Sequence, residues 1–306
     1  MNPDPPSSLT PSAMDDDELL VELAALEADD LGSISDEELW WRIRRVHVGF
    51  RSNALILRPG TSIYRAVRVA EKPAYSHRLS YPPSDRVRAN GRMNFAGQAV
   101  FYGALDQGMQ YSTCLYECRH QPKDYFAVGH WTLKDSLLVN HLGYSRKILQ
   151  AENPKREFPA WTEAEDRTER NALIRAWQGR IFTRKVPDGS EHLYRVTIAL
   201  GRFALSPLIQ PDETLPTAFA GVIYPTISAK FIGDNVALLP HFVDTSLKLE
   251  DAGFLQISYM EEVSHEGLEK EWRTGINVID AAFEFRGDGR IVWNGDGTAL
   301  STSPWP

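Results

Sequence analysis

Short stretches in which apolar residues alternate or cluster, bounded by Gly, Pro or Asp, predict a chain rich in β-strands. A strand, a Pro-Gly turn and a second strand are expected over 54–69, with further strands at 99–106, 126–133, 136–142, 192–205, 219–228 and 235–243. Antiparallel strands are expected from Lys248 onward, where Gly-Asp-Gly at 287–289 predicts a hairpin.

Helical spacing of apolar residues marks the segments between these strands. Helices are expected at 14–31, from Ser35 to about Val46, at 109–121 and between Pro154 and Arg184. The first is acidic and places Leu19, Leu23 and Leu26 on one side, and Ser35 with Glu38 forms a capping-box pattern at the start of the second. Strands and scattered helices without a regular βαβ rhythm predict an α+β fold, with a mixed β-sheet core and flanking helices.

Composition places the chain among globular proteins. Its 306 residues are enough for one large domain or two small ones, and a hydrophobic content of 42% is ample for a buried core. No apolar run approaches the roughly 20 residues of a membrane helix, and residues 1–13, rich in Pro and Ser, lack the layout of a signal peptide. Only two cysteines are present, which suits a reducing compartment. We therefore expect a cytoplasmic protein without a membrane partner, whose first residues are disordered.

The net charge of −8 is unevenly distributed along the chain. Residues 1–39 hold twelve carboxylates and no Lys or Arg, which leaves 29 acidic against 33 basic residues in the remainder. A mildly basic body suits an anionic small molecule, but it lacks the dense basic face that nucleic acid requires. The acidic helix at 14–31 is most simply a solubilising surface helix; the alternative is that it folds against the basic body and regulates access to a site.

Four short motifs carry the candidate chemistry. They are TSIYRA (61–66), NGRMNFAGQAVFYGA (90–104), LYE (115–117) and GVIYPTIS (221–228). Their order of arginine, tyrosine, glutamate and hydroxyl resembles the RES family over roughly residues 58–242. That family comprises NAD-degrading toxins of bacterial toxin–antitoxin systems, and its fold is related to the ADP-ribosyltransferases. With the charge and strand patterns, this resemblance predicts an acidic leader at 1–35, a RES-like catalytic domain at 36–244 and a β-rich C-terminal extension at 245–306. It also implies NAD as the substrate and a cognate antitoxin as a partner.

Cleavage of the nicotinamide–ribose bond explains why these residue types would occur together. The reaction passes through a cationic, oxocarbenium-like transition state, as in glycoside hydrolysis, so a carboxylate near the ribose stabilises it. A cation must hold the pyrophosphate, and a flat aromatic surface must seat the nicotinamide. Because nicotinamide leaves as a neutral base, a strong general acid is not essential, and no metal is expected.

The resemblance assigns the binding residues one by one. Arg65 holds the position of the family's first arginine, for the pyrophosphate, where the alternative is a strand-end arginine in a surface ion pair. Arg92 matches a second family arginine, and Gly91 before it would let the backbone approach a ligand or shape a turn. Tyr102 would pack near the nicotinamide, although core packing explains it equally well, since Tyr102 and its neighbour Phe101 point to opposite faces. Tyr64 has a weaker claim as the neighbour of Arg65.

Glu117 is the strongest catalytic candidate. It lies in an otherwise apolar helical turn, where a carboxylate is costly to bury unless it is paired or functional; the structural alternative is an ion pair with Arg119. By resemblance Glu117 contacts the ribose hydroxyls and stabilises the transition state. The family's serine corresponds to Thr226 or to Ser228, two residues on, and Asn235 is expected in a turn.

Other chemistry is weakly supported. Cys114, Cys118 and His120 have a spacing unlike that of zinc sites, so buried cysteines are favoured, and nucleotide-binding loops and hydrolase motifs are absent from the sequence. The sequence therefore indicates an NAD-consuming enzyme that passes ADP-ribose to water, phosphate or a protein. The alternative is a non-catalytic module that binds NAD or ADP-ribose.

Overall fold

The computed structural model describes residues 14–28, 31, 33–105, 112–152, 168–187, 189–206, 218–226, 233–263 and 271–295. Its α-helices are α1 (Asp16–Glu27), α2 (Asp36–Val46), α3 (Ser112–Glu117), α4 (Arg146–Glu152), α6 (Glu169–Thr183), α7 (Arg195–Ala204) and α8 (Pro240–Ser246). Three 3₁₀ turns are η1 (Ser76–Leu79), η2 (Ser84–Arg86) and η3 (Glu191–Tyr194). The strands are β1 (Leu55–Leu57), β2 (Ser62–Val69), β3 (Phe101–Leu105), β4 (Tyr125–Leu133), β5 (Leu137–His141), β6 (Gly221–Pro225), β7 (Asp234–Leu238), β8 (Leu247–Val263), β9 (Glu271–Ala282), β10 (Glu284–Phe285) and β11 (Ile291–Val292).

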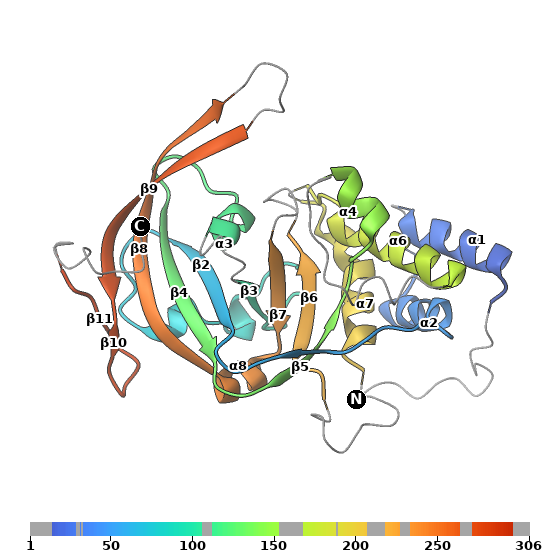
Figure 1. Ribbon diagram of the computed structural model, residues 1–306, viewed down its shortest axis with the longest axis horizontal. Helices are drawn as coiled ribbons and strands as arrows, with labels where there is room; N and C mark the ends of the chain where they lie inside the picture. Colours follow the sequence, from blue (N-terminus) through green and yellow to red (C-terminus); the bar gives the residue numbers. More distant parts are fainter. Residues whose placement is uncertain are drawn as a thin grey trace.

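Nine of these strands form one mixed sheet in the order β1-β5-β6-β7-β3-β2-β4-β8-β9. Only the β5–β6 pair is parallel; the other neighbours are antiparallel. Helices α1, α2, α4, α6 and α7 gather beside β5, β6 and β7, whereas α3 lies over the part of the sheet that contains β2 and β4 (Figure 1). The α+β class with a mixed sheet and flanking helices is therefore confirmed.

The side chains of the core form three clusters around the sheet. One fills the space between the helices and β6–β7 and contains Trp177 and Val222. The second cluster contains Phe101 and Trp131. The third packs α3 onto β4 and β8 through Leu115. The division confirms that Phe101 and its neighbour point to opposite faces, because Phe101 is fully buried in the second cluster while Tyr102 packs against the first.

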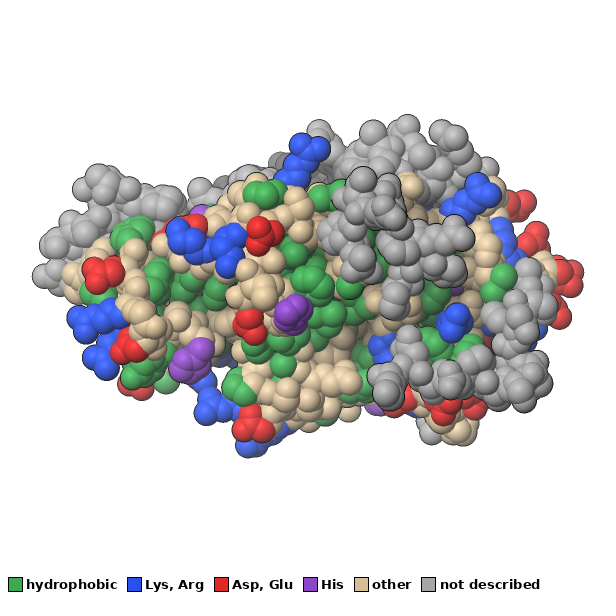
Figure 2. Space-filling view, turned by 90° about the horizontal axis from the view of Figure 1, so that it is seen from below, with side chains coloured by type: hydrophobic (Ala, Val, Ile, Leu, Met, Phe, Trp, Pro, Cys, Tyr) green, Lys and Arg blue, Asp and Glu red, His purple; other side chains and the backbone are tan. Residues whose placement is uncertain are grey.

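The acidic N-terminal helix is part of this packing. Leu19, Leu23 and Leu26 of α1 are buried in the first cluster, as their spacing predicts. Glu22 of α1 pairs with Arg42 of α2 (2.5 Å), and Glu27 pairs with Arg180 of α6 (2.6 Å). Carboxylate side chains gather at the end of the molecule where α1 lies (Figure 2). The acidic helix thus folds against the body, as one of the two sequence interpretations expected.

Two predicted strands are wrong in whole or in part. Residues 192–205, expected as a strand, form η3 and helix α7. Their β-branched residues suggested a strand, but Val196, Ala199 and Leu200 are buried at helical spacing against α2 and α6. The strand expected over 235–243 ends at Leu238, because Pro240 occupies the first turn of α8, where it loses no hydrogen bond.

The remaining elements agree with the sequence pattern, except that α4 was not predicted and that α3 ends at Glu117, before the predicted helix end at residue 121. Ser35 caps α2 by accepting a hydrogen bond from the Glu38 amide (3.0 Å). The strands around the Pro-Gly turn are β1 and β2, and the hairpin at 287–289 joins β10 to β11. The helix expected at 109–121 is α3, and its first expected residues lie outside the described residues, as do residues 1–13. No helix in the described part of the chain is long and apolar enough to cross a membrane.

Candidate functional site

A cavity of about 220 Å³ lies where strands β2 and β3 separate. Strand β2 pairs with β4 along its whole length, but with β3 only at Ile63–Leu105 and Tyr64–Ala104. Continuing this antiparallel register would place Arg65 opposite Gly103 and Ala66 opposite Tyr102. These four residues line the cavity instead. The site therefore begins where the backbone ladder stops.

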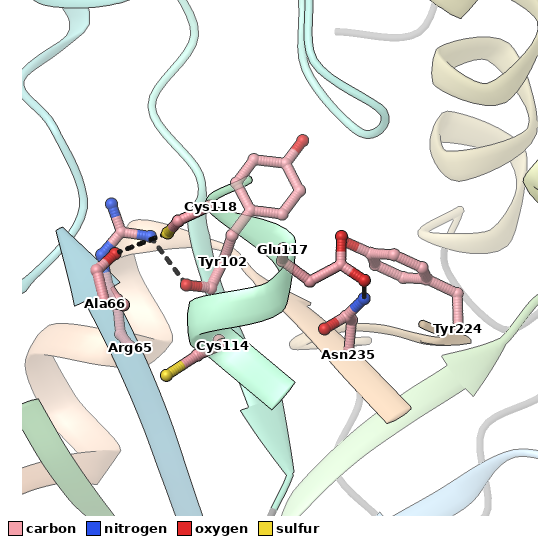
Figure 3. A pocket seen from close by; sticks show the side chains of 9 residues that line it. Arg65, Ala66, Tyr102, Cys114, Glu117, Cys118, Tyr224 and Asn235 are labelled. Carbon is pink, nitrogen blue, oxygen red and sulfur yellow. Dashed lines mark hydrogen bonds between the residues drawn. The ribbon is translucent and has the colours of Figure 1, made fainter. Parts of the chain in front are cut away.

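The other walls come from three elements on the opposite side of the gap. Helix α3 and the residue after it contribute Cys114, Glu117 and Cys118, and strands β6 and β7 contribute Tyr224 and Asn235 (Figure 3). A glycine permits this arrangement, because a Cβ on Gly233 would lie 2.7 Å from the Thr113 hydroxyl of α3. The chain before β7 can therefore approach the helix that carries Glu117.

The Arg65 side chain hydrogen-bonds to backbone carbonyls in the region where β2 and β3 are no longer paired. Its Nε donates to the carbonyl of Ser80 (2.9 Å) and its Nη1 to the carbonyl of Tyr102 (2.7 Å), while the guanidinium lies over the Phe101 ring. Burial lowers the pKa of Arg65, but arginine remains protonated at neutral pH. Among the described residues Nη2 has no hydrogen-bond acceptor. Arg65 is thus both a brace of the gap and a cation at its edge.

Tyr102 is fixed by its hydroxyl and presents its ring to the cavity. The hydroxyl accepts from the Met93 amide (2.8 Å) and donates to Asn94 Oδ1 (2.8 Å). Burial raises the pKa of Tyr102 well above its usual value of 10, so the phenol is neutral. A Cβ on Gly91 would lie 2.5 Å from Asn94 Oδ1 and 3.1 Å from the Tyr102 hydroxyl. Gly91 therefore supports Tyr102 from behind and does not line the cavity.

Two other candidate ligand residues also lie outside the cavity lining. Arg92 donates to the carbonyls of Phe182 (2.6 Å) and Arg184 (3.3 Å), where it satisfies the C-terminal end of α6. Tyr64 stacks on His130, with ring centroids 4.7 Å apart and planes inclined by 15°. Sequence order placed these residues near the site, but their side chains are committed elsewhere.

Glu117 ends α3 with its carboxylate beside two uncharged donors. Its Oε1 accepts hydrogen bonds from the Thr226 hydroxyl and from Asn235 Nδ2 (3.0 Å). The sequence argument from the cost of burial is wrong, because Glu117 is exposed, and no ion pair joins it to Arg119 in the described part of the chain. What holds Glu117 in place is this pair of hydrogen bonds, which leaves Oε2 without a described partner.

The hydroxyl and amide that orient Glu117 come from neighbouring strands. Thr226 follows β6 and is fully buried, and Asn235 in β7 pairs with Tyr224 of β6. The expectation that Asn235 belongs to a turn is wrong: it is the second residue of a buried strand. Ser228, the other candidate for the family's serine, lies outside the described residues. Thr226 therefore fills a defined role, which is to position the carboxylate.

Tyr224 is a cavity residue that the sequence did not single out. It is buried, its ring lies 5.8 Å from that of Phe182, and burial raises the pKa of its phenol well above 10. Every residue of the apolar strand GVIYP is buried, so the sequence pattern does not distinguish Tyr224 from its neighbours, and the position of α3 brings it to the cavity. With Tyr102 it gives the cavity two neutral aromatic walls.

The two cysteines form an apolar wall. Cys118 Sγ contacts the carbonyl of Ala66 (3.6 Å), and burial raises its pKa to about 11 and that of Cys114 well above 9. His120 does not join them, because its ring nitrogens contact Leu115 O (3.0 Å) and Thr274 Oγ1 (3.1 Å). No group of three His, Cys, Asp or Glu that could hold a metal ion occurs among the described residues.

Five side chains from five elements thus converge on one gap: Arg65, Tyr102, Glu117, Tyr224 and Asn235. They supply a cation, aromatic surfaces and an oriented carboxylate, but neither a nucleophilic thiolate nor a metal site within the described chain. None of the nine lining residues belongs to α1, so the acidic helix does not line this cavity. Neither a scan of the sequence against protein-family models nor a search of curated proteins found a match.

Proposed function

We propose that the protein is an NAD-consuming enzyme that cleaves the nicotinamide–ribose bond. The observation that carries the proposal is the convergence of Arg65, Tyr102 and Glu117, far apart in the sequence, on the gap between β2 and β3. The same three residues are the ones that the RES-like order of motifs selects from the sequence. Independent agreement between motif order and spatial clustering is what supports NAD as the substrate.

The size of the cavity supports binding of one end of the dinucleotide. Drug-sized ligands occupy pockets of roughly 300–1,000 Å³, whereas this cavity measures about 220 Å³. It suits the nicotinamide and its ribose, with Tyr102 and Tyr224 beside the flat ring. The pyrophosphate would then lie at the edge, where Arg65 Nη2 is the cation available to it.

Glu117 acts in this proposal on the charge that develops at the ribose. As the bond to nicotinamide lengthens, positive charge spreads over the ribose carbon and ring oxygen, and a fixed carboxylate stabilises it. Thr226 and Asn235 hold Oε1, so the orientation of the carboxylate costs little at the moment of reaction. Oε2 is left to contact the ribose hydroxyls. Nicotinamide departs as a neutral base, which explains why no acid is needed opposite Glu117.

We further propose that the mixed sheet is of the ADP-ribosyltransferase-like kind, with its substrate in the gap between β2 and β3. The acceptor of ADP-ribose would be water or phosphate, or a protein side chain in a transferase. By the same resemblance the enzyme would inhibit growth from within the cytoplasm and would have a cognate antitoxin. These parts of the proposal rest on the resemblance and not on the cavity.

The test is direct. Purified protein is incubated with NAD in the presence and absence of phosphate, and the products are identified by mass spectrometry. Release of nicotinamide with ADP-ribose indicates hydrolysis, and ADP-ribose 1″-phosphate indicates phosphorolysis. ADP-ribose attached to added protein indicates a transferase. Binding of NAD without release of nicotinamide would show a non-catalytic binding module instead.

A further inference from the structure

Three polar side chains outside the cavity form a chain of hydrogen bonds across neighbouring strands. His130 in β4 lies opposite Tyr64 of β2 on one side and opposite Asp251 of β8 on the other. Its Nδ1 is 2.8 Å from Asp251 Oδ2, and its Nε2 is 3.0 Å from Ser62 Oγ. A serine, a histidine and an aspartate therefore stand in the order and at the distances of a catalytic triad.

The hydrogen bonds define the role of each group. The Asp251 carboxylate can only accept, so Nδ1 carries the proton and Nε2 is left as the acceptor for the Ser62 hydroxyl. The ring is also held by stacking on Tyr64 at 4.7 Å. His130 is thereby fixed in the tautomer and orientation of a general base for Ser62.

A β-bulge lies directly beside this alignment. The register between β4 and β8 shifts between His130 and Trp131, where Asp251 faces His130 and Leu249 faces Trp131. Glu250 is the extra residue, and its carboxylate accepts from Thr132 Oγ1 (2.7 Å) and pairs with Lys248 (2.6 Å). Bulges re-aim side chains and are frequent beside functional sites. If the register of the pairs from Trp131 to Leu133 continued through His130, Glu250 would lie opposite His130.

Burial differs between the acid and the other two groups. The side chain of Asp251 is 9% exposed and that of His130 is 18% exposed, and Ser62 is also partly exposed. The carboxylate is thus the more shielded from water, while the histidine and the serine are both partly accessible. None of the three residues lines the cavity described above, so their chemistry is separate from the proposed cleavage of NAD.

We propose that Ser62 is an activated nucleophile that accepts an acyl group from small activated esters. Ser62 Oγ forms a bond to the acyl carbon, its proton passes to His130 Nε2, and the bond to the leaving-group oxygen breaks with return of that proton. Water then releases the acyl group by the same steps. Because Ser62 lies in a paired strand and not at a helix N-terminus, we assign only substrates with a good leaving group, which need little oxyanion stabilisation.

The test uses the full chain with p-nitrophenyl acetate and no NAD. We expect an acetyl group on Ser62, located by mass spectrometry of peptides, and acetylation about 100-fold slower in His130→Gln. Ser84→Ala, which alters an exposed serine of η2, should leave the acetylation of Ser62 unchanged. A wild-type protein without acetyl-Ser62 would overturn the proposal, as would an unchanged rate in a His130→Gln variant with a native melting temperature.

Discussion

Two interior regions of the molecule use their polar side chains in different ways. In the helical layer, His47 is buried with Nδ1 against Ile43 O (2.7 Å) and Nε2 against Gln178 Nε2 (2.9 Å), so both nitrogens are satisfied. In the gap between β2 and β3, Arg65 Nη2 and Glu117 Oε2 have no described partner. The first region is closed and stabilises the fold. The second is held open and can bind a ligand.

The difference follows from how each region satisfies its backbone. Helices satisfy their own amides, so the side chains of His47 and Gln178 are available to pair with each other. Where β3 leaves β2, the ladder is lost, and Arg65 donates to the carbonyls of Ser80 and Tyr102 in its place. A guanidinium that hydrogen-bonds to backbone carbonyls still has N–H donors left for a ligand, whereas a backbone amide paired in a sheet has none. The incompletely paired backbone of the gap is therefore what makes it a candidate binding site.

The largest expected effect sharpens this comparison at Glu117. Gln in its place still accepts from Thr226 and Asn235 but carries no charge, so the fold should be unchanged. Loss of the charge should slow NAD cleavage by about 10²–10³-fold, the usual effect of one group that stabilises transition-state charge. The initial rate of nicotinamide release measures it. Glu284→Gln, an exposed residue of β10, is the control, and equal rates in all three proteins would refute the assignment.

The closed region should respond to pH. Burial lowers the pKa of His47 from 6.5 to about 4, so the folded state binds fewer protons than the unfolded state between these values. Stability should therefore fall as pH drops from 6.5 to 4, by about 3 kcal/mol in all. Urea unfolding across this range measures it, and His47→Gln should flatten the slope. A slope unaffected by the substitution would show that His47 is not the group that titrates.

The third prediction compares the loss of stability when an arginine is removed from the gap and from the surface, both in β2. Arg65→Met leaves the carbonyls of Ser80 and Tyr102 without their donor, which should cost about 2 kcal/mol of unfolding free energy. Arg68 donates to the carbonyls of Cys118 (3.2 Å) and Arg119 (3.0 Å) and pairs with Asp124 (3.0 Å), but it is half exposed and water can replace it, so Arg68→Met should cost less than about 1 kcal/mol. The urea midpoints of the two variants, measured under the same conditions, give the two losses of stability. Similar losses would mean that Arg65 does not brace the gap.

The smallest effect concerns the orientation of Glu117. Thr226→Val keeps the volume of the side chain but removes the hydroxyl that donates to Oε1. Catalytic turnover should fall about tenfold, the equivalent of one hydrogen bond of about 1.4 kcal/mol, while KM for NAD changes little. Thr226→Ser should restore most of the rate. A rise in KM alone would instead indicate that Thr226 contacts the substrate.

Much of this arrangement could be predicted from the sequence. The apolar pattern located β2, β3 and β4, and the motif order selected Arg65, Tyr102 and Glu117, which the fold brings together. Local patterns were sufficient because each of these residues lies in or beside a short regular element.

What the sequence could not show depends on contacts between distant elements. Asn235 was predicted in a turn, but it lies in β7, which pairs with both β6 and β3. Arg92 was predicted to bind the ligand, but its side chain donates to the carbonyl of Phe182 near the end of α6. Helix α7 was predicted as a strand because Val196, Thr197 and Ile198 are consecutive β-branched residues, whereas its contacts with α2 and α6 bury it as a helix. The end of the β2–β3 pairing, on which the cavity depends, has no signature in either strand alone.

The central claim is that the gap between β2 and β3 binds the nicotinamide end of NAD. A crystal structure of the Glu117→Gln variant with NAD tests it most directly, because this variant should bind the substrate without consuming it. We predict the nicotinamide between Tyr102 and Tyr224, the ribose hydroxyls within hydrogen-bonding distance of residue 117 and a phosphate oxygen at Arg65 Nη2. NAD bound elsewhere, or a gap that stays empty at saturating NAD, would contradict the account.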